Sequence, residues 1–190
     1  MYGRRVKTTI FVGDLADAPA EALCTSTNPR LSLAMGTGGA VRGRGGYEVL
    51  RECEAILTSA GRHLAPGSAH ITSGGSLPTK VLIHCVASDD AHRSSAGVIH
   101  SCVLNALACA DARDCASVAM PVFATGHAHF NFDEALQVMA KAIRATASRV
   151  ERVFIVINDE DRIADVRRRF KNADVVRGEV EEPESFWQSR

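Results

Sequence analysis

Short apolar runs separated by helical patterns most strongly constrain what this chain can fold into. The runs at 81–87 (VLIHCVA), 117–123 (SVAMPVF) and 152–157 (RVFIVI) are apolar for most of their length, as is typical of strands covered on both faces of a sheet. Shorter apolar or β-branched runs, bounded by turn residues, add further strands. Strands are therefore predicted at 8–12, 22–27, 69–73, 81–87, 117–123 and 152–157.

Between these runs, apolar residues recur at helical spacing. Within 47–60, Leu50, Cys53 and Leu57 share one face while charged residues take the other. Similar patterns predict helices at 94–110, 133–147 and 163–170, and a helical pattern also follows the glycine cluster near residue 40. This alternation predicts an α/β fold, a three-layer α/β/α domain with a central mixed sheet of about six strands.

Length and charge limit the domain count and the partners. A chain of 190 residues suits one domain with a full core. The 22 basic residues balance 22 acidic ones, so no global charge favours nucleic acid or an anionic membrane. We expect a single domain over 1–175 and an acidic C-terminal extension over 176–190, which carries Glu179, Glu181, Glu182 and Glu184.

The cysteine pattern and the N-terminus bear on the compartment. All six cysteines lie in apolar runs, without a Cys-x-x-Cys pair or a zinc-site spacing. This favours a reduced intracellular protein over a disulfide framework, with neither a metal nor a cofactor expected. The N-terminal apolar run is too short for a signal peptide, and no run approaches ~18 apolar residues. We expect a soluble, cytoplasmic protein without a membrane partner.

Three segments that directly follow predicted strands are the candidate ligand contacts, because α/β sheets bind ligands at the carboxyl ends of their strands. They are Gly13 to Leu15, Asn28 with the glycine cluster Gly36, Gly38 and Gly39, and Ala124 to Phe130. Glycines that lead into a helix let backbone amides approach a phosphate. A tight surface connection is the alternative interpretation. The spacing matches neither the dinucleotide fingerprint nor a Walker loop.

Six segments, taken in order, carry the patterns of one known family. They are Gly13-Asp14-Leu15, Cys24 to Asn28 (CTSTN), Ala34 to Val41 (AMGTGGAV), Glu52-Cys53, Leu77 to Val86 (LPTKVLIHCV) and Met120 to Gly126 (MPVFATG). From Thr8 to about Phe170 the chain resembles the macro domain, which binds ADP-ribose. The resemblance implies the α/β/α fold and a site built from these segments.

The resemblance also implies a role for individual residues. Asp14, with the Leu15 amide, would bind the adenine amine, and Asn28 would bind the distal ribose. Ile157 or Asn158 would lie against the adenine. Backbone amides would close over the diphosphate from Gly36, Thr37, Gly38 and Gly39 on one side and from Ala124, Thr125, Gly126, His127 and Ala128 on the other. Taken alone, Asp14 and Asn28 are also typical turn residues.

Several positions depart from the hydrolytic members of the family. Their loop aspartate and helix histidine correspond here to Gly38 and Arg42. An aromatic near the distal ribose corresponds to Ala128, which leaves Phe130 or Tyr47 as substitutes. No lysine is placed to form a covalent intermediate, because Lys80 begins a strand. His127 and His129 would supply a base, form a weak metal pair or be exposed loop residues.

The sequence thus predicts binding of ADP-ribose, or of mono-ADP-ribosyl groups on a protein or nucleic acid. Removal of the group is expected to be slow or absent, with Asn28 and His127 as the catalytic candidates. Two alternatives stay open. One is an efficient hydrolase with a non-standard site. The other is a poly-adenine RNA-binding module, less favoured, that uses Arg42, Arg44, Arg51 and Arg167 to Arg169.

Overall fold

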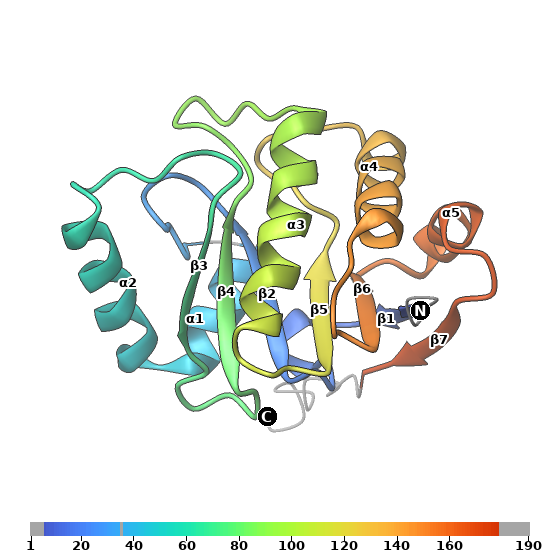
Figure 1. Ribbon diagram of the computed structural model, residues 1–190, viewed down its shortest axis with the longest axis horizontal. Coiled ribbons are helices and arrows are strands. Elements are labelled where there is room, and N and C mark those ends of the chain that lie inside the picture. The colour runs from blue at the N-terminus through green and yellow to red at the C-terminus, as the bar shows by residue number, and fades with distance from the viewer. Residues whose placement is uncertain (1–5, 35, 179–190) are drawn as a thin grey trace, which may run out of the picture.

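The computed structural model describes residues 6–34 and 36–178, and within them one seven-stranded sheet forms the middle layer (Figure 1). The strand order is β3-β4-β2-β5-β6-β1-β7, and every neighbouring pair is parallel except β3 with β4. The strands are β1 (Lys7–Val12), β2 (Ala22–Thr27), β3 (Ala69–Ser73), β4 (Val81–Val86), β5 (Ser117–Pro121), β6 (Arg152–Ile157) and β7 (Asp174–Arg177).

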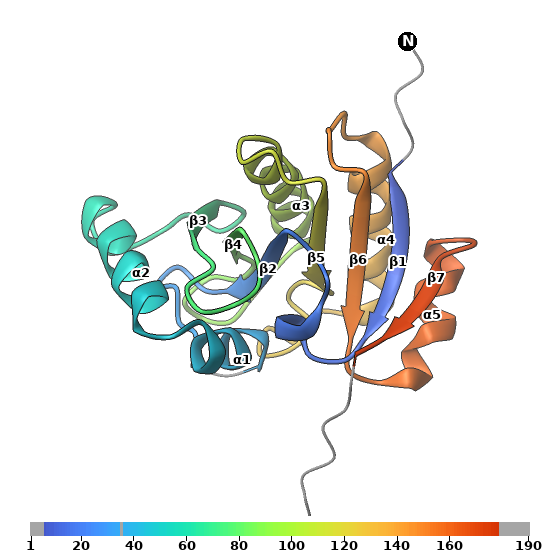
Figure 2. The same cartoon turned by 90° about the horizontal axis from the view of Figure 1, so that it is seen from below.

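Helices cover both faces of this sheet (Figures 1 and 2). The helices are α1 (Gly36–Gly45), α2 (Tyr47–Ser59), α3 (Ala96–Asp111), α4 (Phe132–Ala145) and α5 (Ile163–Arg169). One core contains side chains of α3, α4 and α5, and a second core contains side chains of α1 and α2. The predicted α/β/α architecture with a mixed sheet is confirmed.

The alternation of side chains along β4 explains the two cores. Val81, Ile83 and Cys85 pack in the core beneath α3, whereas Leu82 and Val86 pack on the face covered by α1 and α2. Successive side chains of a strand point to opposite faces. A run that is apolar at every position is therefore buried only when helices cover both faces.

His84 is a buried polar residue on the α2 face. Its Nδ1 lies 3.1 Å from Thr25 Oγ1, and its Nε2 lies 2.9 Å from Thr72 Oγ1 and 3.7 Å from Cys53 Sγ. Burial, assisted by His70, lowers the pKa of His84 to about 4, and the charge of Glu52 opposes this shift. The ring is therefore neutral near pH 7, and its hydrogen bonds join β2, β3 and α2.

Several element bounds shift by one or two residues, for example the end of β5 at Pro121, and three larger features differ from the sequence prediction. The seventh strand, β7, was not predicted, because its four residues DVVR carry little apolar pattern. It pairs with β1 and ends at Arg177, two residues beyond the expected boundary, and the four glutamates of the expected extension lie outside the described residues. The glycine cluster belongs to the first turn of α1 rather than to a loop before it.

Two further observations concern the cysteines and the membrane. All six cysteines are free thiols. No helix in 6–34 or 36–178 has both the length and the apolar character needed to cross a bilayer.

The depressed pKa of His84 predicts a loss of stability in acid. The unfolded chain binds a proton near pH 6.5 that the folded chain binds only near pH 4, so stability is complete above pH 6.5 and falls as the pH decreases below it. Between pH 7 and 5 the free energy of unfolding should fall by about 2 kcal/mol more in the wild type than in His84→Gln. Urea unfolding at both pH values measures this, and equal decreases would contradict it.

Candidate functional site

The candidate site begins where β2 and β5 separate. β2 pairs with β4 along its whole length, but its pairing with β5 comprises only Ala22 with Val118 and Leu23 with Ala119. The chain then leaves β2 toward α1 on one face and leaves β5 toward α4 on the other. A crevice forms at such a point in an open α/β sheet, and ligands bind there.

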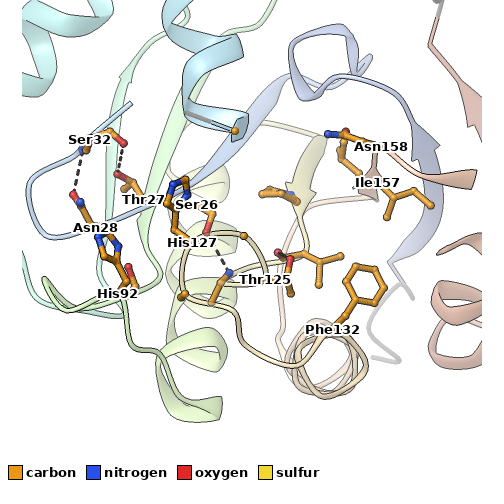
Figure 3. A pocket seen from close by; sticks show the side chains of 18 of the residues that line it. Ser26, Thr27, Asn28, Ser32, His92, Thr125, His127, Phe132, Ile157 and Asn158 are labelled. Atoms are coloured by element: carbon orange, nitrogen blue, oxygen red, sulfur yellow. Dashed lines mark hydrogen bonds between the residues drawn. The ribbon is translucent and has the colours of Figure 1, made fainter. Parts of the chain in front are cut away.

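A cavity of about 540 Å³ occupies this crevice (Figure 3). It is lined by segments that follow β2, β4, β5 and β6, together with the starts of α1 and α4. The lining comprises Ser26, Thr27, Asn28, Ser32, Ala34, Gly36, Ser88, His92, Pro121, Val122, Ala124, Thr125, Gly126, His127, Ala128, Phe132, Val156, Ile157, Asn158, Asp159 and Arg162. Of the residues that the sequence suggested for the site, the structure therefore brings together Asn28, Gly36, residues 124–128, Ile157 and Asn158 around one cavity.

Asn28 combines the two roles considered for it. Its Oδ1 accepts hydrogen bonds from the backbone N–H groups of Arg30 at 3.1 Å and Ser32 at 3.2 Å, so the side-chain carbonyl closes the turn after β2. Within the described residues its amide nitrogen has no acceptor. The two amide hydrogens are thus available to a ligand in the cavity.

The loop after β5 presents a run of unpaired backbone donors. Ala124, at a φ of 64°, donates to Ser26 Oγ at 3.3 Å, and Thr125 Oγ1 donates to the Val122 carbonyl at 2.8 Å. These bonds fix the loop, yet the N–H groups of Thr125, Gly126, His127 and Ala128 have no acceptor within 6–34 and 36–178. Consecutive free amides of this kind make an anion-binding concavity.

The first turn of α1 faces the same cavity from the other side through Gly36. Amides in the first turn of a helix have no acceptor within the helix and carry partial positive charge. Gly38 and Gly39 belong to this turn but do not line the cavity, and the side chain of Thr37 lies outside the part that the structure describes. A Cβ at Gly38 would lie 3.0 Å from Leu33 Cα, so the close packing of α1 on the preceding turn also favours glycine there.

Two imidazoles meet across the cavity. His92 follows β4 and His127 follows β5, and their ring centroids lie 5.9 Å apart. His92 has a φ of 56°, which is unusual for a residue other than glycine. His129 does not line the cavity, and the described residues contain no cluster of three metal-ligating side chains. His92 was missed by the sequence analysis, although it lies in a polar segment after a predicted strand.

The opposite end of the cavity is more apolar. Figure 3 shows Phe132, Ile157 and Asn158 at this end, away from Asn28 and His92. The Arg162 guanidinium lies 4.7 Å from the centre of the Phe132 ring. Among the described lining residues, Phe132 is the only phenylalanine, tyrosine or tryptophan. The two aromatics expected as substitutes, Phe130 and Tyr47, do not line it, and Tyr47 is 79% exposed.

Asp14 and Leu15 lie beside the cavity but do not line it. Asp14 Oδ1 accepts from the Ala16 N–H at 2.8 Å and caps a short 3-10 helix, Leu15–Asp17. This is the turn role that the sequence also allowed. The Leu15 side chain is buried in the core beneath α1 and α2. The Gly13 N–H donates to the Ile157 carbonyl at 2.9 Å, so this turn is attached to the apolar end of the cavity.

Comparison with known proteins gives one consistent result. The family model described as "Macro domain" matches residues 24–139. An "O-acetyl-ADP-ribose deacetylase" of Klebsiella pneumoniae is 29% identical over 168 residues, which cover 86% of this chain and 95% of that protein. A "Macro domain-containing protein in sno 5'region" of Streptomyces nogalater is 32% identical, covering 80% of this chain and 84% of the relative.

Solved structures share the fold. A variant of the Oceanobacillus iheyensis macrodomain with ADPR superposes with a TM-score of 0.79 at 24% identity, covering 85% of this chain and 90% of that one. The same macrodomain with ADP gives a TM-score of 0.77, covering 84% and 87%. The Trypanosoma brucei macrodomain in complex with ADP-ribose gives 0.75 at 18% identity, covering 85% and 68%.

Proposed function

Because the chain belongs to the macro domain family, we propose that its cavity binds ADP-ribose, either free or attached to a protein or nucleic acid. The observation that carries the proposal is the run of free amides at Thr125 to Ala128, which lines a cavity that α1 enters from the other side. A diphosphate placed between them would accept hydrogen bonds from both. The relatives solved with ADP and ADP-ribose support this assignment.

The two ends of the cavity suit the two ends of this ligand. Asn28 offers amide hydrogens and lines the same side of the cavity as two imidazoles in Figure 3, which suits the hydroxyl groups of the distal ribose. Phe132, Ile157 and Val156 offer apolar surface for the adenine, with the Asn158 amide beside them. In this orientation Asp14 lies at the adenine end, where its turn is attached to Ile157.

We propose that this protein recognises ADP-ribosyl groups and removes them slowly or not at all. The positions that carry an acid and a base in hydrolytic relatives are Gly38, which has no side chain, and the exposed Arg42. Among the described lining residues the only carboxylate is Asp159, whose Oδ1 accepts from the Asp161 N–H. Near Asn28, the candidate bases that line the cavity are His92 and His127.

Affinity for two ligands tests the binding proposal. ADP-ribose should bind with a micromolar Kd, about 7 to 9 kcal/mol, and AMP should bind more weakly because it lacks the distal ribose. Asn28→Ala should reduce this difference. Asn28→Asp is the matched control, since it keeps the oxygen that closes the turn but removes both donors. Calorimetry measures all six Kd values, and equal affinity of the wild type for both ligands would contradict the proposed orientation.

The rate of ADP-ribose release distinguishes a protein that only binds ADP-ribosyl groups from a hydrolase. The substrates are a target that carries ADP-ribose on glutamate and O-acetyl-ADP-ribose. This protein should release ADP-ribose from them about a hundredfold to ten-thousandfold more slowly than the Klebsiella pneumoniae relative does, because a positioned acid or base is missing. The His127→Ala and His92→Ala variants should then release ADP-ribose at nearly the same rate as the wild type. Rapid release by the wild type, abolished in His127→Ala while ADP-ribose binding is retained, would establish a hydrolase with a histidine base.

A further inference from the structure

A second cavity lies at the other end of the sheet from the candidate site. Its volume is about 1190 Å³, and it is formed by the start of β1 and the C-terminal ends of α4 and α5. We call it the basic groove. Six of the described residues that line it are cationic, namely Lys7, Lys141, Arg144, Arg168, Arg169 and Lys171, and none of the described lining residues is an aspartate or glutamate. Basic and acidic residues are equal in number along the whole chain, so this concentration is local.

Four of these cations have no carboxylate partner within the described residues. Lys7 pairs with Asp174, and Arg168 pairs with Asp165 and lies 3.6 Å from Asp133. No ion pair in 6–34 or 36–178 involves Lys141, Arg144, Arg169 or Lys171. The buried Nε of Arg169 has no hydrogen-bond acceptor there either. The groove therefore carries a surplus of positive charge.

The helix ends offset only part of this surplus. Both α4 and α5 end at the groove, and each helix C-terminus carries about half a negative charge. Arg144 donates to the Arg169 carbonyl at the end of α5, which is the ordinary use of a basic residue at a helix end. The partial negative charges of the two helix ends together offset about one positive charge, out of the four on the unpaired cations. The others remain available to an anionic ligand.

From these observations we propose that the basic groove binds the phosphodiester backbone of a single-stranded nucleic acid. Neutral donors beside the cations, among them Gln137, Thr146, Ser148 and Asn172, suit phosphate oxygens. Phe170 also lines the groove, but it is buried and Arg144 lies over its ring, so it offers no platform for stacking a base. Recognition is therefore by charge, independent of sequence.

An acidic peptide is the other polyanion to consider for this groove, and the strand pairing of the sheet argues against peptide binding there. Peptides commonly bind by pairing with the open edge of a sheet. Lys7 and Thr8 of β1 line the groove and pair with β6, whereas the pairing of β1 with β7 begins only at Thr9. Only two residues of strand edge are therefore open at the groove, which is shorter than an ordinary paired strand. A phosphodiester backbone needs only the side-chain donors.

The arginines grouped from the sequence separate in the structure. Arg42, Arg44 and Arg51 lie in α1 and α2, on the other face of the sheet from α4, and Arg44 and Arg51 pair with Asp17 and Glu48. Of Arg167 to Arg169, only the last two line the groove. Lys141, Arg144 and Lys171, which the sequence did not single out, complete it.

Salt-dependent binding tests the proposal. A labelled RNA of about 12 nucleotides and mixed sequence should bind the wild type, with log K falling against log salt at a slope near −2, as about three phosphate contacts predict. DNA of the same sequence should bind similarly. The double variant Lys141→Gln/Lys171→Gln should bind more weakly, with a slope shallower by about 1.4. The matched control is Arg42→Gln/Arg113→Gln, which removes the same charge from exposed sites outside the groove.

The remaining outcomes separate this site from the ADP-ribose cavity. Saturating ADP-ribose should leave RNA binding unchanged, and Lys141→Gln/Lys171→Gln should leave ADP-ribose affinity unchanged. Displacement of the RNA by ADP-ribose, or equal weakening in both double variants, would overturn the proposal. Binding of poly-glutamate without binding of RNA would also overturn it, because the groove would then serve an acidic polypeptide.

Discussion

The candidate site depends on how early β2 and β5 stop pairing. Only two register pairs join these strands, and beyond them β2 pairs only with β4 and β5 only with β6. After the strands end, the chain leaves them toward opposite faces of the sheet. Pro121 ends β5 and has no N–H to extend the pairing. Ser26 Oγ then accepts from the Ala124 N–H, so a side chain replaces the missing ladder and fixes the loop after β5. The free amides of residues 125–128 follow from this geometry, because a continued ladder would have paired the backbone there.

Much of the site was predictable from the sequence by a single rule, that ligands contact the segments directly after parallel strands. This rule identifies Asn28, residues 124–128, Ile157 and Asn158, because each follows a strand whose apolar pattern is plain. The same rule applied to 81–87 would have found Ser88 and His92. Phe132 and Arg162 could not be found in this way, because their contact depends on how α4 packs beside the end of β6.

The fold shows a similar division between local and non-local information. Alternating strands and helices gave the layers, and the boundary of β5 at Pro121 is local chemistry. The strand β7 was missed because four largely exposed residues form it only by pairing with β1, which lies far away in the sequence. The buried hydrogen bonds of His84 likewise join residues from three elements. No pattern within one segment could reveal them.

The two ends of the sheet offer different chemistry to anions. At the carboxyl ends, neutral amides and a helix start provide partial charges fixed in position, which suits a ligand held in one orientation. At the amino end of β1, exposed lysines and arginines provide full charges on flexible side chains, which suits a polyanion held without a fixed register. Because β1 is about 20 Å long, the two sites are separate in space.

The central claim is that the amides of Thr125 to Ala128 hold the diphosphate of ADP-ribose. An amide-resolved NMR titration of the isotope-labelled protein with ADP-ribose tests it most directly. The account predicts that the largest chemical-shift changes fall on residues 125–128 and Gly36, with smaller changes at Asn28 and Asn158 and none across 137–148. Saturation of binding without a change at residues 125–128, or with the largest changes in the basic groove, would contradict it.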